Sequence, residues 1–158
     1  MERLIRMAVE RGINVEDLII NAIRNVSSDP TEVVRLRLEL AKAYLSEARE
    51  YVGRGDAVQA SERAYRAAEN VIKALAEKYN TPEHQQAVRE GRWHIDLLIK
   101  AVTTLSNKLG HWVSIGWASA FLIYDMGFHE AKLTVDAITG YIDEVEKMVR
   151  EAEKVLMH

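Results

Sequence analysis

The sequence predicts an all-α protein: an antiparallel helical bundle with an N-terminal amphipathic helical arm. Apolar residues recur at helical spacing along most of the 158 residues, and no segment alternates apolar and polar residues as a strand does. Only two prolines and eight glycines interrupt the chain, which allows long helices. Hydrophobic residues make up 48% of the chain, as expected for a globular domain with its own core.

Residues 1–28 form the predicted arm. A short helix over residues 2–11 ends at Gly12, and a second begins after Asn14, a favourable N-cap residue. The apolar positions of this second helix keep helical spacing, at Val15, Leu18, Ile19, Ala22, Ile23 and Val26. The arm is therefore amphipathic, and it either folds back on its own bundle or crosses to a partner subunit.

The bundle domain is predicted to span residues 29–158. Asp29 can cap the helix that follows, Pro30 suits the first helical position, and Glu32 completes a capping-box arrangement. The helix over residues 30–52 then has its apolar face, interrupted by Glu47, at Val33, Leu36, Leu40, Ala43, Tyr44 and Tyr51. A turn at Gly53-Arg54-Gly55-Asp56 ends it and begins an antiparallel partner.

That partner, over residues 57–79, has two contrasting sides. One side carries small residues that let a neighbouring helix approach closely, at Ala57, Ala60, Ala64, Ala67, Ala68, Val71, Ala74 and Leu75. The other carries a polar stripe of Gln59, Arg63, Arg66, Asn70 and Lys73. Glu62 with Arg66, and Glu69 with Lys73, are predicted i,i+4 ion pairs. A solvated face is the ordinary role of such a stripe; the alternative is a phosphate site in a groove shared with Arg89 or Arg92.

The second half of the chain predicts four more helices. A short one runs from Thr81-Pro82 to Gly91, and the next covers residues 92–109 with Trp93 turned inward. The segment 111–126 is apolar nearly all round, which predicts a helix at the centre of the bundle or in a subunit interface. It is too short to span a membrane, which takes about 20 apolar residues.

The last helix is predicted from Phe128 to the C-terminus. Its apolar face repeats at Ala131, Val135, Ile138, Ile142, Val145, Val149, Ala152 and Leu156. Its solvent side is predicted to carry the ion pairs Asp143 with Lys147 and Glu146 with Arg150.

Composition excludes several classes of function. The net charge is −3 and no basic block occurs, so the chain lacks the concentrated positive charge typical of nonspecific nucleic-acid binding. It has no cysteine, which rules out disulfides and thiolate metal ligands and suits a reducing or hot compartment. The N-terminus lacks the pattern of a signal peptide. We therefore expect a cytoplasmic protein without a cofactor.

Several segments together resemble the PaREP-type archaeal paralogous family. The most specific is the Gly-Asp-x-x-Gln-Ala segment at residues 55–60, and the likeness extends to the arm at residues 15–20. Other matching segments are residues 29–30, 40–48, 61–69, 72–76, 91–93, 117–120 and 127–131. The resemblance implies an archaeal, heat-adapted bundle of the HEPN-like superfamily, related to the substrate-binding domains of nucleotidyltransferases. Many such domains bind nucleotides or act as toxin ribonucleases, commonly as dimers.

The resemblance also supplies a catalytic hypothesis. HEPN ribonucleases use an Arg-x(4–6)-His motif, in which arginine steadies a phosphate and histidine transfers a proton. Arg89 and His94 fit this spacing, but Gly91 breaks the helix on which they would converge. His111 is a second candidate, although serine stands where the motif has arginine and Lys108 is the nearby cation. Roles in a turn and at helix starts are the ordinary interpretation of these residues.

No metal site is predicted. Asp125 and His129 have i,i+4 spacing and Glu130 adds a carboxylate, but Gly127 separates the pair and the spacing suggests no third ligand. A helix break followed by acidic residues explains the same pattern.

These observations favour a noncatalytic HEPN-like module that forms a homodimer and binds a nucleotide, an RNA or a partner protein, without metal or membrane. Its predicted binding residues are Arg63, Arg66, Asn70, Lys73 and Arg92. The alternatives are a metal-independent ribonuclease of the toxin kind, using Arg89, His94 or His111, and a structural scaffold for protein interactions. An enzyme would bring a histidine and a cation together in a cleft.

Overall fold

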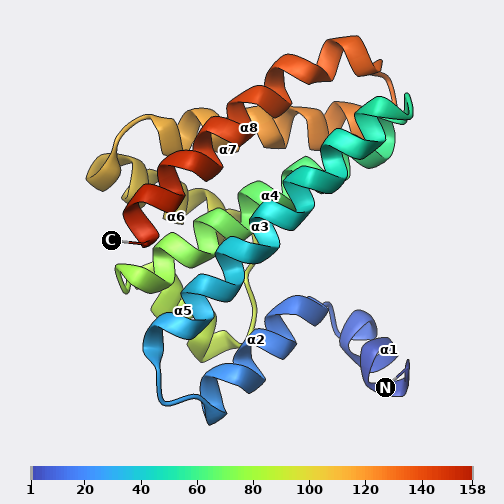
Figure 1. The fold of residues 1–158 in the computed structure, drawn as a ribbon. Coiled ribbons are helices and arrows are strands. Elements are labelled where there is room, and N and C mark those ends of the chain that lie inside the picture. Colours follow the sequence, from blue (N-terminus) through green and yellow to red (C-terminus); the bar gives the residue numbers. More distant parts are fainter. Residues whose placement is uncertain (1, 158) are drawn as a thin grey trace.

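The computed structural model describes residues 2–157, which form eight α-helices, one π-helical segment and no strand. This confirms the predicted all-α fold. The elements are α1 (Glu2–Glu10), α2 (Val15–Val26), α3 (Pro30–Gly53), α4 (Ala57–Lys78), α5 (Pro82–Glu90), α6 (Ile95–Leu109), α7 (Trp112–Ile123), η1 (Tyr124–His129) and α8 (Val135–Leu156). Helices α3 and α4 form a long antiparallel hairpin, with α7 and α8 above it and α1, α2 and α5 below it in Figure 1. No described helix combines the length and the apolar character that a membrane crossing requires.

The predicted caps begin the helices because each supplies an oxygen to a free backbone N–H group. Asn14 Oδ1 accepts from the backbone N–H of Asp17 at 3.1 Å. The side chains of Asp29, Asp56 and Thr81 accept backbone N–H bonds in the same way at the starts of α3, α4 and α5.

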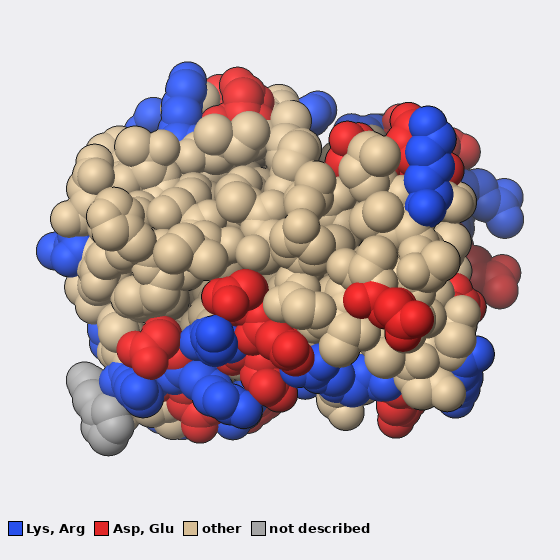
Figure 2. Space-filling model, turned by 90° about the horizontal axis from the view of Figure 1, so that it is seen from above, with Lys and Arg blue, Asp and Glu red and all other residues tan. Residues whose placement is uncertain are grey.

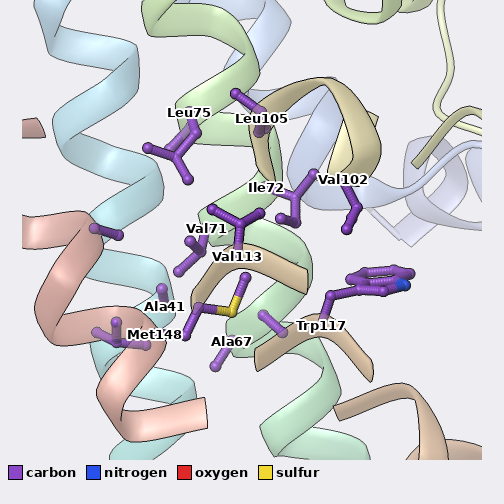
Figure 3. Packing of buried hydrophobic residues seen from close by; sticks show 14 of the residues in the cluster. Ala41, Ala67, Val71, Ile72, Leu75, Val102, Leu105, Val113, Trp117 and Met148 are labelled. Carbon is purple, nitrogen blue, oxygen red and sulfur yellow. The ribbon is translucent and has the colours of Figure 1, made fainter. Parts of the chain in front are cut away.

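Helix α4 is the centre of the bundle, in contact with α3, α6, α7, α8 and η1. Its alanine face is buried as predicted, and Ala60, Ala64, Ala67, Ala68 and Ala74 are all fully buried. Figure 3 shows the larger side chains that fill the space around it, among them Ile72, Leu75, Leu105, Val113 and Met148. The polar stripe meets two neighbours: Arg63 pairs with Glu47 of α3, whereas Asn70 and Lys73 face Glu16 and Asp17 of the arm.

The buried face of α3 is rotated by part of a helical turn from the predicted one. Ala43 is exposed and Leu36 and Leu40 are only half-buried. Val33 is buried as predicted, but the other buried positions are Val34, Arg37, Leu38, Ala41 and Ala48. Two interactions that cannot be read from apolar spacing cause this rotation: small Ala41 and Ala48 let α3 approach α4, and Arg37 is held inward by buried polar partners.

The predicted helix break at Gly127 is also wrong. The chain continues from α7 into the π-helical segment η1 and passes through Gly127 to His129, and α8 begins only at Val135. A Cβ atom at Gly127 would overlap Ser61 of α4, so glycine lets η1 lie directly against the central helix. The reversal comes afterwards, at Ala131 with φ of 52°.

Three of the predicted ion pairs are present: Glu62 with Arg66, Glu69 with Lys73, and Glu146 with Arg150. The predicted pair of Asp143 with Lys147 is wrong. Asp143 instead lies 2.7 Å from Arg49 of α3, and Lys147 bonds to Glu144. A tertiary contact between α3 and α8 therefore replaces the local pair.

Helix α7 is buried on one side only. Val113, Gly116, Trp117, Ala120 and Ile123 are buried against neighbouring helices. Its other side exposes Ile115, Phe121 and Leu122, and the neighbouring helix α6 exposes Ile95 and Ile99. Figure 2 shows a broad uncharged area on the face seen from above, bordered by a row of charged side chains. The 111–126 helix was predicted to lie at the centre of the bundle or in a subunit interface, and only one side of it is buried in the bundle.

Candidate functional site

The polar stripe of α4 is partly covered by α2. Asn70 and Lys73 are each only 3% exposed, whereas Arg63 is half-buried and Arg66 is exposed. The solvated face that such a stripe ordinarily forms is therefore absent at its C-terminal end. Buried polar groups require partners, because burial without them costs several kcal/mol.

The partners form a compact cluster contributed by three helices. Lys73 Nζ donates to Asp17 Oδ2 of α2 at 2.8 Å and to Glu69 at 2.6 Å. Arg37 of α3 donates from Nη1 to Asn70 Oδ1 at 3.1 Å, and its Nη2 lies 2.7 Å from Asp17 Oδ1. One carboxylate of the arm thus lies between two buried cations of the bundle.

The cations keep this carboxylate ionised. Burial alone raises the pKa of the Asp17 carboxyl, but the charges of Lys73 and Arg37 and the hydrogen bond from Lys73 lower it by more, so it lies below its ordinary value of 3.8. The match between the groups is nevertheless incomplete. The close contact between Asp17 Oδ1 and Arg37 is not a hydrogen bond, and Arg37 Nε also has no hydrogen-bond partner. Arg37 therefore does not use its planar fork in the paired way that suits it best.

Beside the cluster lies a cavity of about 20 Å³, room for a single water molecule. Its polar lining comprises Asp17, Asn21 and Arg24 from the arm, and Arg37, Lys73, Glu77, His84 and Arg92 from the bundle. The bundle alone contributes three cations and one carboxylate, and Glu77 is already paired with Arg24 of the arm. This cavity is called the cationic pocket below.

His84 faces the same pocket from α5. Burial lowers the pKa of its imidazole below the ordinary 6.5; Glu77 opposes this effect, whereas Arg24 and Arg37 add to it. The ring is therefore neutral at pH 7.

A second cavity, of about 120 Å³, lies farther along α4. It is lined by Asn14 and Glu16 of the arm and by Glu62, Tyr65, Arg66, Glu69, Asn70 and Tyr124. The rings of Tyr65 and Tyr124 stack in parallel with centroids 3.9 Å apart. The first turn of α2 contributes side chains to both cavities, Asp17 to the cationic pocket and Glu16 to the second cavity.

The structure does not bring the predicted catalytic residues together. Arg89 is exposed near the end of α5, and no hydrogen bond or ion pair joins it to His94 in the described part of the chain. His94 instead occupies the N-cap position of α6 without a capping side-chain hydrogen bond, and its Nε2 lies 3.2 Å from Glu90. His111 is exposed at the start of α7, and Lys108 lies over the ring of Tyr79. Of the cations named from the sequence, Lys73 and Arg92 do meet in one pocket.

Within residues 2–157 no group of three or more histidine or acidic side chains is placed to hold a metal ion. Asp125 and His129 both lie on η1, where the His129 ring packs edge-on against Tyr124 with centroids 4.4 Å apart.

Sequence reasoning missed most of the polar residues of the pocket, among them Asp17, Arg37 and His84. Asp17 has the ordinary pattern of an acidic residue in the first turn of a helix, and Arg37 lies between two leucines on a charged amphipathic helix. Their local sequence does not distinguish these residues from charged residues that face solvent. The one available signal was the polar stripe of α4, which needs countercharges if anything covers it.

The fold and the cluster together define an all-α bundle whose central polar face is covered by an N-terminal arm. The chain belongs to the archaeal PaREP1/PaREP8 family, whose model matches residues 36–149. This confirms the resemblance seen in the sequence. The match contains Arg37, Lys73, His84 and Arg92 of the pocket and begins after the arm.

Solved structures support the same assignment. A crystal structure of a Sulfolobus solfataricus protein is 34% identical, with a TM-score of 0.70 over 75% of this chain and 98% of that one. A solution structure of the same target protein, also 34% identical, gives a TM-score of 0.65 over 75% of this chain and 92% of that one. A comparison with curated proteins found no match.

Proposed function

We propose that the protein is a noncatalytic HEPN-like module that binds a phosphate-bearing ligand, a nucleotide or an RNA, at the cationic pocket. The observation that carries this proposal is the convergence of Arg37, Lys73 and Arg92 from α3, α4 and the segment before α6. Cations that are held in place and partly desolvated make the strong charge-assisted bonds that phosphate oxygens accept. The uneven count of three cations and one carboxylate in the bundle lining favours an anion.

A test compares Arg92→Gln with Arg89→Gln, because both arginines are exposed and only Arg92 lines the pocket. Titration calorimetry with ADP and with a short RNA should show about tenfold weaker binding for Arg92→Gln, since a hydrogen bond to a charged group contributes about 1.5–3 kcal/mol. Arg89→Gln should bind like the original protein. Equal affinities for the two variants would contradict a site at this pocket.

One observation favours the ribonuclease alternative in a changed form. A neutral histidine, His84, shares the pocket with Arg92 and Lys73, which is the juxtaposition that a proton-transfer site needs. The lining holds no second histidine to serve as the complementary acid or base. We therefore expect the RNA used in the titration to stay intact without metal. Cleavage that His84→Ala abolishes would overturn the noncatalytic function.

We also propose a homodimer formed through α6 and α7. This is supported by the exposed Ile99 of α6 and by the exposed Ile115 and Phe121 of α7, a helix that carries no acidic or basic residue. Exposed apolar areas of this kind mark association sites. Sedimentation at micromolar concentration should give twice the chain mass of 18.0 kDa, and Ile115→Glu should give the monomer. A monomeric original protein would contradict the dimer.

A further inference from the structure

We propose that the first turn of α2 is an internal ligand: the Asp17 carboxylate occupies the anion site formed by Arg37 and Lys73, and a bound nucleotide displaces it together with the arm. This inference rests on the phosphate-binding function proposed above. It adds a regulatory element, because the arm and the ligand would then compete for the same two cations.

The first support is the source of the countercharge. Arg37 and Lys73 belong to the bundle, and each is only 3% exposed. The carboxylate that lies between them comes from the arm. Lys73 also has Glu69 on its own helix, but the structure pairs Arg37 with Asp17 alone among the acidic residues it describes. With the arm displaced, Arg37 would keep only a neutral partner, Asn70.

The second support is the incomplete match between Arg37 and Asp17. Arg37 lines the cationic pocket, yet its Nε has no hydrogen-bond partner, and neither has Asp17 Oδ1. A phosphate group presents several oxygens and can bond a guanidinium fork at two nitrogens at once. Exchange of the carboxylate for a phosphate would therefore satisfy a buried donor that the arm leaves without a partner.

The third support is the way the arm is attached. Ile20 is buried, but Leu18, Ile19 and Val26 of α2 are 40%, 54% and 86% exposed. Part of the apolar surface of α2 therefore stays exposed and does not attach the helix to the bundle. Charged contacts attach it as well: Asp17 in the cluster, Arg24 with Glu77, and Glu16 with Arg66. A segment that depends on such charged contacts can be displaced by a competing anion.

The comparison with relatives agrees with a separable arm. The family match begins at residue 36, beyond α2. The Sulfolobus structure aligns over 98% of its own length but only 75% of this chain, so about a quarter of this chain lies outside the shared fold. The pocket residues of the bundle, in contrast, all lie inside the family match.

The groove beneath the arm suits a nucleotide better than a single phosphate. Without the first turn of α2, the cationic pocket and the second cavity would join along α4. Lys73 follows Tyr65 by eight residues, which corresponds to about 12 Å along the helix axis. One end offers cations for phosphate. The second cavity is lined by the carboxylates of Glu62 and Glu69, which pair with Arg66 and Lys73 and can also accept bonds from ribose hydroxyls, as acidic residues do in other nucleotide sites.

The experiment uses the full chain and three proteins: the original, Asp17→Asn, and Glu10→Gln as a control that removes an exposed arm charge outside the cluster. Calorimetry with ADP should show at least tenfold tighter binding for Asp17→Asn than for the other two. Hydrogen exchange of the original protein supplies a readout that needs no variant. Saturation with ADP should remove the protection of the α2 amides while α4 stays protected.

The two proposals fail in different ways. If the original protein and Asp17→Asn bind ADP with equal affinity, and α2 stays protected in the complex, the displacement of the arm is wrong and the phosphate site remains. If neither protein binds ADP or a short RNA, although both are folded by circular dichroism, the phosphate-binding function fails and the internal-ligand role fails with it.

Discussion

Replacing Trp117 with alanine is expected to lower the free energy of unfolding by about 3–5 kcal/mol, the usual range for removing a buried aromatic side chain. Trp117 of α7 is 6% exposed and belongs to the main core cluster. Its ring lies 5.6 Å from that of Tyr65 on α4 and 6.1 Å from that of Phe121, measured between centroids. The truncated side chain would leave a cavity between two helices whose backbones other contacts hold apart.

Urea denaturation followed by circular dichroism measures this loss. Trp112→Ala is the control, because Trp112 lies on the same helix but is only half-buried, with its indole N–H bonded to the Leu109 carbonyl at 3.1 Å. It should lose clearly less stability than Trp117→Ala. A loss below about 1 kcal/mol for Trp117→Ala would be too small for a buried aromatic residue and would contradict its position in the core.

Adding one methyl group at Gly116 is expected to destabilise the protein, whereas the same change at Gly140 should stabilise it. A Cβ atom at Gly116 would lie 2.5 Å from the Cβ of Met148, a buried residue of α8. A Cβ atom cannot rotate away, so α7 and α8 would have to separate, and such overpacking costs about 1–3 kcal/mol.

Gly140 lies within α8, and a Cβ atom there would meet nothing within 4 Å. Alanine at this position should therefore add about 0.5–1 kcal/mol to stability through its greater helix propensity. Thermal unfolding of Gly116→Ala and Gly140→Ala, measured together, should move the two midpoints in opposite directions. Equal shifts would show that α7 and α8 do not approach as closely as the structure indicates.

Local sequence was sufficient to predict features that depend on a side chain and the backbone within a few residues of it. Asn14, Asp29 and Thr81 were identified as helix starts, and Gly91 as a helix end, because capping depends on groups within a few residues. The alanine face of α4 was equally predictable, since small residues repeated at helical spacing have few other uses. The order and approximate bounds of most helices follow from these two kinds of signal.

Sequence reasoning failed where the position of a residue depends on its contact with a segment far away in the sequence. The inner face of α3 was misplaced because Arg37 is turned inward by Asp17 and Asn70, which lie 20 and 33 positions away. The end of α7 was misplaced because glycine at 127 allows close approach to Ser61 of α4 and does not stop the helix. Arg49 likewise takes the carboxylate of Asp143 that a local pair would have used.

The polar stripe of α4 shows which features of the candidate site were predictable from the sequence and which depended on tertiary contacts. The sequence determined that the stripe exists, that Glu69 pairs with Lys73, and that Arg92 could share a groove with it. Only the tertiary structure decided that α2 covers the stripe, that Asp17 lies between Arg37 and Lys73, and that His84 joins the same pocket. The physical reason is that charge pairing in a buried cluster depends on which helices meet. The sequence around each charged residue does not show which distant helix it will contact.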